Sequence, residues 1–137
     1  MMRLAIAFAL MATPMLSHAQ REESCPLLLP EGAIMVARPP AGWIPGPKSL
    51  VRLTGAGVMS GPPERMGYLV PSGDKKIKGG HMTTFVFDPG EEKWLWCEYG
   101  TAATHIAKRM DDAATRCELT SKEERRGVYS EVKVVCK

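Results

Sequence analysis

The residues with the most chemical potential in this sequence are four cysteines, Cys25, Cys97, Cys117 and Cys136. They are widely spaced, and none belongs to the close Cys-x-x-Cys pair that zinc sites and redox centres use. No histidine stands beside any of them. In an exported chain, an even number of cysteines is typical of a disulfide framework. We therefore expect two disulfides, and neither a metal nor another cofactor.

Three pairings of these cysteines are possible, and the C-terminal segment bears on the choice. A two-residue turn at 126–127 would place Cys117 directly opposite Cys136 in a hairpin. Counting outward from that turn makes them a hydrogen-bonded pair, whose side chains lie further apart than those of the other pair type. The favoured expectation is therefore Cys97–Cys117 and Cys25–Cys136, with the other pairings left open.

Two histidines, His81 and His105, are the candidates for acid–base chemistry. His81 follows two glycines, a pattern typical of a turn, and His105 lies on the polar side of an expected helix. The acidic pairs Glu91-Glu92 and Asp111-Asp112 are adjacent in sequence, so their side chains diverge and form no glycosidase-like pair. The chain also lacks Gly-x-Ser-x-Gly and His-Glu-x-x-His. Catalysis is therefore not favoured, and a weak hydrolase using either histidine is kept as a lesser alternative.

Three tryptophans are the candidates for contact with a partner. Trp43 stands in a proline-rich segment, where a large side chain often anchors an interface, although packing across the end of a strand is the favoured expectation. Trp94 and Trp96 alternate in the stretch WLWCEYG, so they share one face of an expected strand. The opposite face carries Leu95, Cys97 and Tyr99 and is the expected core side. We expect Trp94 and Trp96 to be buried beneath a helix, with presentation to a partner as the alternative.

The first residues have the three-part pattern of a secretory signal peptide. A short basic start precedes the apolar segment 4–16, and Ser17-His18-Ala19 supplies a small-x-small cleavage site. Pro14 interrupts the apolar run, which argues against a stable membrane anchor. Cleavage is expected between Ala19 and Gln20. The expected organisation is a signal peptide, 1–19, and one mature domain, 20–137, located in the periplasm.

The charge pattern excludes one class of partner. The whole chain carries a net charge of +3 at pH 7, and its basic residues are scattered along the sequence. A nucleic-acid-binding protein usually shows a stronger basic stripe interleaved with exposed aromatic side chains. We expect no nucleic-acid partner.

Short apolar or alternating segments, separated by glycine and proline turns, predict the elements that must hold these residues. The fold class is α+β and β-dominated: an antiparallel sheet of about five to seven short strands with one amphipathic helix. The expected helix is Thr101–Ala114, with Thr101 as its N-cap. The expected strands are Ala33–Val36 at an edge, Ser49–Thr54, Gly57–Ser60, Gly67–Val70, Thr83–Phe87, Lys93–Tyr99, Thr115–Thr120 and Val128–Cys136.

The order of several short motifs resembles a family of small exported proteobacterial proteins known by the locus tag of an enteric member. The motifs are Cys25-Pro26, Ala41-Gly42-Trp43, Gly61-Pro62-Pro63-Glu64, Leu69-Val70-Pro71, Trp94-Leu95-Trp96-Cys97-Glu98-Tyr99, Cys117 and Cys136. The resemblance spans nearly the whole mature chain and implies a soluble periplasmic protein, with no catalytic residues to carry over. The chain departs from it at 84–87, where a tryptophan-led strand is expected.

These observations favour a non-enzymatic, protein-binding module of the periplasm. By analogy of class and compartment, it is expected to act as inhibitors of cell-wall hydrolases or immunity proteins do. Its expected partner is another periplasmic or imported protein. The first alternative is an envelope structural or housekeeping protein without a tight partner.

Overall fold

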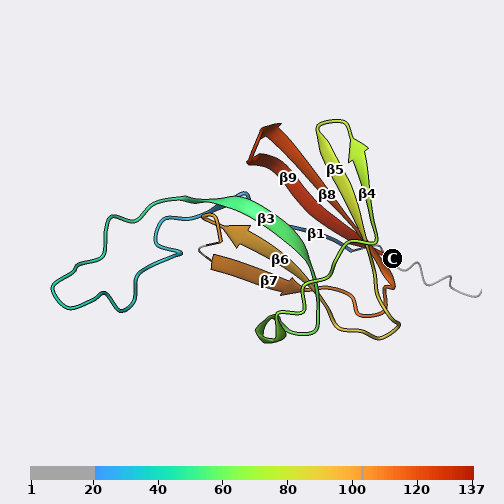
Figure 1. Ribbon diagram of the computed structural model, residues 1–137, viewed down its shortest axis with the longest axis horizontal. Helices are drawn as coiled ribbons and strands as arrows, with labels where there is room; N and C mark the ends of the chain where they lie inside the picture. Colours follow the sequence, from blue (N-terminus) through green and yellow to red (C-terminus); the bar gives the residue numbers. More distant parts are fainter. Residues whose placement is uncertain (1–20, 103) are drawn as a thin grey trace, which may run out of the picture.

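The computed structural model describes residues 21–102 and 104–137, which form nine strands and one short 3-10 helix (Figure 1). The expected signal peptide, 1–19, with its cleavage site at Ala19 and Gln20, lies outside the described residues. The elements are β1 (Glu22–Ser24), β2 (Leu28–Leu29), β3 (Val51–Ser60), η1 (Pro63–Arg65), β4 (Gly73–Ile77), β5 (Gly80–Val86), β6 (Lys93–Tyr99), β7 (Thr104–Arg109), β8 (Arg116–Arg125) and β9 (Val128–Cys136).

The strands form two sheets, and every pair of neighbours is antiparallel. The first sheet has the order β1-β9-β8-β5-β4, and the second has the order β2-β3-β6-β7. The expected β-dominated, antiparallel architecture is therefore confirmed. The expected single sheet of about five to seven strands is wrong, because the nine strands of the described residues divide between two sheets. No helix of the described part is long and apolar enough to cross a membrane.

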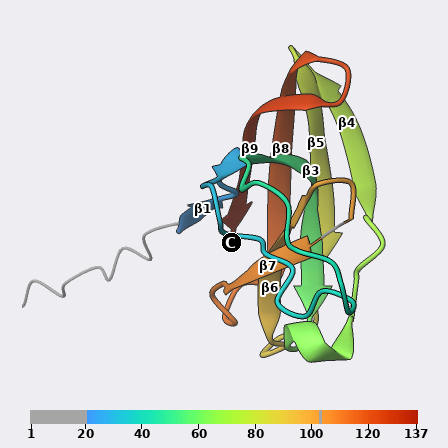
Figure 2. The same cartoon turned by 90° about the vertical axis from the view of Figure 1, so that its left-hand side faces the viewer.

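Alternation along the strands builds the core between the two sheets (Figure 2). In β6 every second residue from Lys93 to Tyr99 is buried, which confirms the expected core face. The first sheet faces it with an equivalent row of apolar side chains on β5, β8 and β9. The two inner faces supply Leu53, Val58, Leu95, Cys97, Tyr99, Phe85, Cys117, Leu119, Val132 and Val134.

The expected helix at 101–114 is wrong, because this segment contributes strand β7 and the loop after it. Gly100, Thr101 and Ala102 all have left-handed φ, at 63°, 57° and 66°. A run of this kind makes a tight turn, and the expected N-cap Thr101 is part of that turn. β7 then pairs with β6 along its whole length. Met110 and Ala114 reach the core from the following loop, so the helix-like spacing of apolar residues reflects two different local structures.

The expected disulfide pairing is also wrong. The structure joins Cys25 to Cys97 and Cys117 to Cys136, and no free cysteine remains among the described residues. Cys25 directly follows β1 at the edge of the first sheet, and Cys97 lies in the middle of β6 in the second. The Cys25–Cys97 bond therefore ties the two sheets together.

A shift in the alternation of hydrogen-bonded and non-hydrogen-bonded residue pairs along the hairpin explains why Cys117 and Cys136 can form a disulfide. The two residues are directly opposite, as the hairpin register predicts, with Cα atoms 4.1 Å apart. Two irregularities within 122–125 of β8 interrupt the ladder near the turn. Beyond them, Arg116 and Lys137 exchange both backbone hydrogen bonds. The neighbouring cysteines therefore occupy a non-hydrogen-bonded position, where opposing side chains lie close enough to bond.

Other differences from the expected strands concern the middle of the chain. The segments expected at 49–54 and 57–60 join into the single strand β3. The segment 67–70 makes one isolated bridge between Tyr68 and Met59, and 33–36 forms no strand. Strand β4 was missed, because its charged sequence GDKKI follows a turn signal and lacks an apolar face.

Candidate protein-binding site

Three aromatic rings lie together on the outer face of the second sheet, and we call them the aromatic cluster: Tyr68, Trp96 and His105. Tyr68 meets Trp96 edge to face, with ring centroids 5.4 Å apart. His105 completes the group, with its ring centroid 5.5 Å from Trp96 and 6.2 Å from Tyr68. Tyr68 comes from the loop after η1, Trp96 from β6 and His105 from β7, so three segments build one surface.

Glycines on β3 make room for this cluster. Gly57 lies opposite Trp96, and a Cβ at Gly57 would stand 2.7 Å from the indole nitrogen. Gly55 lies opposite Glu98, and a Cβ there would stand at an ordinary contact distance of 3.4 Å from a carboxylate oxygen of Glu98. Gly57 within the strand thus reflects close approach by the Trp96 ring rather than a break between two strands. Met59, almost fully buried, faces this side beside Tyr68.

A pocket of about 190 Å³ opens beside the cluster. The η1 turn and the left-handed Met66 (φ 49°) carry the chain back across β3, where Tyr68 forms one wall. The lining residues are Met59, Pro63, Tyr68, Trp96, His105, Ile106 and Ala107. Such a mainly apolar pocket with aromatic walls can accept an apolar, aromatic or cationic side chain of a partner.

His105 lies between a hydroxyl group and a carboxylate. Its Nδ1 is 3.4 Å from the hydroxyl oxygen of Tyr68, and its Nε2 is 3.3 Å from Oε2 of Glu98. This arrangement can orient the imidazole and move a proton. Among the described residues, however, His105 has no serine hydroxyl within hydrogen-bonding distance, and every cysteine there is in a disulfide. The Tyr68 hydroxyl and the Glu98 carboxylate hold the imidazole of His105 in an arrangement that can bind a polar group.

His81 lies apart from the cluster, in the first sheet. Its Nδ1 is 3.0 Å from a carboxylate oxygen of Asp74 on β4, and both side chains are about half exposed. The hydroxyl of Thr83 donates a hydrogen bond to the other oxygen of Asp74. This is a solvated cross-strand pair, and the structure does not bring the two histidines together.

Trp94 shares the outer face of β6 with Trp96, as the alternation predicts, but no helix covers either residue. Both are partly buried by neighbouring strands and loops. The Trp94 indole donates a 2.6 Å hydrogen bond to Glu92. Nearby, Arg109 donates to Asp112, and this hydrogen bond lowers the pKa of the Asp112 carboxyl and raises that of the guanidinium. Trp94 therefore borders a charged rim beside the aromatic cluster.

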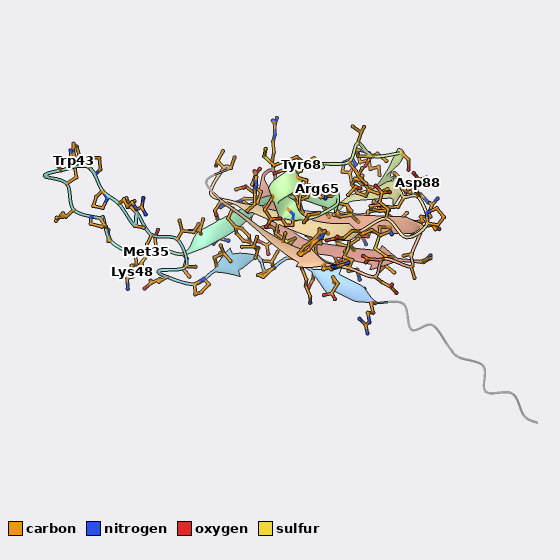
Figure 3. All side chains as sticks on the ribbon, turned by 90° about the horizontal axis from the view of Figure 1, so that it is seen from below. Met35, Trp43, Lys48, Arg65, Tyr68 and Asp88 are labelled. Atoms are coloured by element: carbon orange, nitrogen blue, oxygen red, sulfur yellow. A yellow bond between two sulfur atoms is a disulfide. The ribbon has the colours of Figure 1, made fainter. Side chains whose placement is uncertain are left out.

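Trp43 lies at the far end of a long loop, residues 30–50, that connects β2 to β3. We call this loop the arm. It extends well away from both sheets (Figures 1 and 3). The Trp43 side chain is 73% exposed and its neighbour Ile44 is 88% exposed. The favoured expectation that Trp43 packs across the end of a strand is therefore wrong, and Trp43 is the most exposed of the three candidate tryptophans.

Several residues of this surface were not predicted from the sequence. Tyr68, Met59 and Gly57 have no motif of their own, although a Gly-x-Gly inside a strand pattern is a signal for close approach of another group. Among residues 21–102 and 104–137, no three histidine, cysteine, aspartate or glutamate side chains lie together as a metal site would require.

The fold and the site together define a class of protein. Two sheets joined by a disulfide display an aromatic pocket and an apolar arm. These are the features of a protein-binding module.

Comparison with known proteins agrees with this class. A family model described as "Type VI secretion system Tli immunity protein" matches residues 47–137, which is well over half of the chain. The chain belongs to this family. No curated protein and no solved structure shows significant similarity to it.

Proposed function

We propose that this protein is exported to the periplasm, where it binds and neutralises a toxin that a type VI secretion system delivers. The observation that carries the proposal is the family match over 47–137, which includes strands β3 to β9 and the aromatic cluster. Immunity by binding needs a complementary surface and no chemistry of its own, in line with the surface described above.

The compartment is supported by two independent features of the chain. The sequence begins with a signal-peptide pattern, and the expected mature start at Gln20 lies just before β1, whose first residue is Glu22. Both disulfides lie in or beside strands, and such bonds form and persist in oxidising compartments such as the periplasm. A toxin that acts there would meet its immunity protein already folded.

The contact surface in this proposal is the outer face of the second sheet together with the arm. Trp96 and its pocket would receive a side chain of the toxin, Trp94 with its charged rim would border the contact, and Trp43 would reach beyond it. Tryptophan is the residue most enriched among the dominant contacts of protein interfaces.

The test is protection of living cells. Candidate toxins, taken from the genes beside this protein's gene, are each expressed with a periplasmic export signal, alone or together with this protein. Growth should be restored by the full chain and not by a version without residues 1–19, which would stay in the cytoplasm. Unchanged killing in the presence of the exported, folded protein would contradict the proposal.

A further inference from the structure

The arm displays apolar side chains that nothing in the described structure covers. Five large ones along it are more than half exposed: Met35, Val36, Trp43, Ile44 and Leu50. Monomeric soluble proteins rarely leave many apolar groups together in water, and such a surface commonly marks a binding site. The arm therefore has the composition of a contact surface.

The arm is shaped before any partner arrives. Two β-turns fold it, one closed by a 3.1 Å hydrogen bond from Ala33 to the Pro30 carbonyl and the other by a 3.0 Å bond from Trp43 to the Pro40 carbonyl. The third residue of each turn is a glycine with left-handed φ: Gly32 at 81° and Gly42 at 83°. Prolines at three further positions restrict the backbone, namely Pro39, Pro45 and Pro47. Binding would consequently cost less ordering entropy than it would for a flexible loop.

The base of the arm is fixed to the body of the protein. Leu29 of β2 pairs with Val51 of β3 at the point where the arm begins and ends. Just below, Leu53 donates a hydrogen bond to the carbonyl of Leu27. The Cys25–Cys97 disulfide then joins this segment to β6. The arm is thus held in a defined direction relative to the aromatic cluster on the same sheet.

The chemistry of the tip indicates what it fits. Residues 39–47, PPAGWIPGP, contain no charged side chain. An open pocket of about 220 Å³ lies between 34–36 and 45–48, so the two limbs of the arm run near each other. A projecting, uncharged and apolar hairpin is complementary to a concave apolar cleft. Arg38 and Lys48 flank the tip and could meet anionic headgroups, so a lipid surface is tested below as a separate outcome.

We propose that the arm inserts Trp43 and Ile44 into an uncharged apolar cleft of the toxin and is the main anchor of the complex. This inference rests on the proposed function and adds the segment that makes the contact. The family match begins at residue 47, so the tip lies outside the part of the chain that the match covers.

The experiment measures binding of a detoxified form of the toxin identified in the protection test to the purified mature protein by biolayer interferometry. Trp43→Ala should weaken the Kd by about 30-fold or more, mainly through faster dissociation. Ile44→Ala should weaken it by about 5-fold. Val70→Ala is the matched control, because Val70 is also 88% exposed but lies outside the arm, and its Kd should stay within about 2-fold. These exposed substitutions should leave the circular dichroism spectrum and the thermal midpoint unchanged.

A photo-crosslinking amino acid at position 43 locates the contact. Crosslinks to apolar residues that line a cleft of the toxin support the inference, and crosslinks to a charged surface contradict it. If the wild-type protein binds and Trp43→Ala binds equally well, the arm is not the anchor, while the immunity function stands. If the wild-type protein does not bind, the proposed function fails and this inference fails with it.

Two other binding partners of the arm, a second copy of the chain and a lipid surface, are tested in parallel. Light scattering after gel filtration detects a second copy of the chain, and sedimentation with phosphatidylethanolamine–phosphatidylglycerol vesicles detects a lipid surface. Loss of self-association or of vesicle binding in Trp43→Ala, with the toxin Kd unchanged, would overturn the inference in favour of that partner.

Discussion

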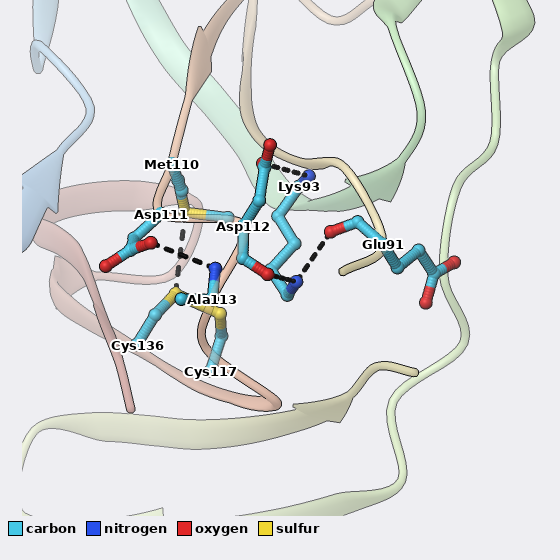
Figure 4. Close-up of a disulfide and its surroundings, with 8 residues drawn as sticks. All are labelled: Glu91, Lys93, Met110, Asp111, Asp112, Ala113, Cys117 and Cys136. Carbon is cyan, nitrogen blue, oxygen red and sulfur yellow. Dashed lines mark hydrogen bonds between the residues drawn. A yellow bond between two sulfur atoms is a disulfide. The ribbon is translucent and has the colours of Figure 1, made fainter. Parts of the chain in front are cut away.

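Lys93 is a fully buried charged residue at the start of β6 (Figure 4). Its ammonium group donates hydrogen bonds to the backbone carbonyls of Glu91 at 2.6 Å and Asp112 at 2.8 Å, and lies 4.9 Å from the centre of the Phe87 ring. Lys93→Met keeps the length of the side chain but removes both hydrogen bonds. Because buried carbonyls that lose a donor are costly, we expect the free energy of unfolding to fall by about 2 kcal/mol.

Urea denaturation of the two purified proteins measures this change. Lys122→Met is the control, because Lys122 pairs with Glu131 at the surface and its loss should cost about 0.5 kcal/mol or less. A loss below 0.5 kcal/mol for Lys93→Met would show that the two hydrogen bonds do not offset the cost of burying the charge.

For single residues, the sequence predicted correctly which way a side chain points but not which other side chains it contacts. Alternation alone placed Trp94 and Trp96 on one face and Cys97 on the other, since successive side chains of a strand point to opposite sides. It could not place Tyr68 and Glu98 around His105, because those contacts depend on which strands become neighbours.

Gly57 shows how one strand can determine the shape of a site carried by another. A methyl group at this position would stand 2.7 Å from the indole nitrogen of Trp96, so the ring would have to move away from Tyr68 and His105. We expect Gly57→Ala to destabilise the protein by about 1–3 kcal/mol and to alter the near-ultraviolet circular dichroism of the aromatic cluster. Gly73→Ala on β4 is the control, because its nearest neighbour is 4.0 Å away. Equal effects of the two substitutions would contradict this interpretation.

The strands that could be predicted are those marked by a sequence pattern of consecutive residues, such as alternation or a turn signal. β6 was expected with the bounds it has, and the C-terminal hairpin was expected with its turn and register. β7 was mistaken for a helix because Ile106, Ala107 and Met110 have helical spacing and the segment lacks alternation. Its pairing with the edge of β6 makes it a strand instead. The shift in pair alternation within 122–125 could not be foreseen, because a bulge leaves little trace in an alternating sequence.

For the molecule as a whole, the two disulfides should contribute unequally. Cys25–Cys97 closes a loop with a sequence separation of 72, and Cys117–Cys136 closes one of 19. Loop-entropy reasoning gives about 4 kcal/mol for the first bond and about 3 kcal/mol for the second. Replacing both cysteines of one bond by alanine, followed by chemical denaturation, should therefore destabilise the protein more for the 25–97 pair. The reverse order would contradict this, and an unchanged thermal midpoint in reductant would contradict any structural role for the bonds.

The same Cys25–Cys97 bond determines the outcome of proteolytic cleavage within the arm. The arm is exposed along most of its length, and exposed loops are preferred sites of cleavage. A cut anywhere between residues 30 and 50 divides the chain, but Cys25 remains on one fragment and Cys97 on the other. The fragments stay covalently joined, and β1 stays paired with β9. A nicked molecule would thus migrate as an intact chain until it is reduced, and its partner-facing tip could be severed while the folded body persists.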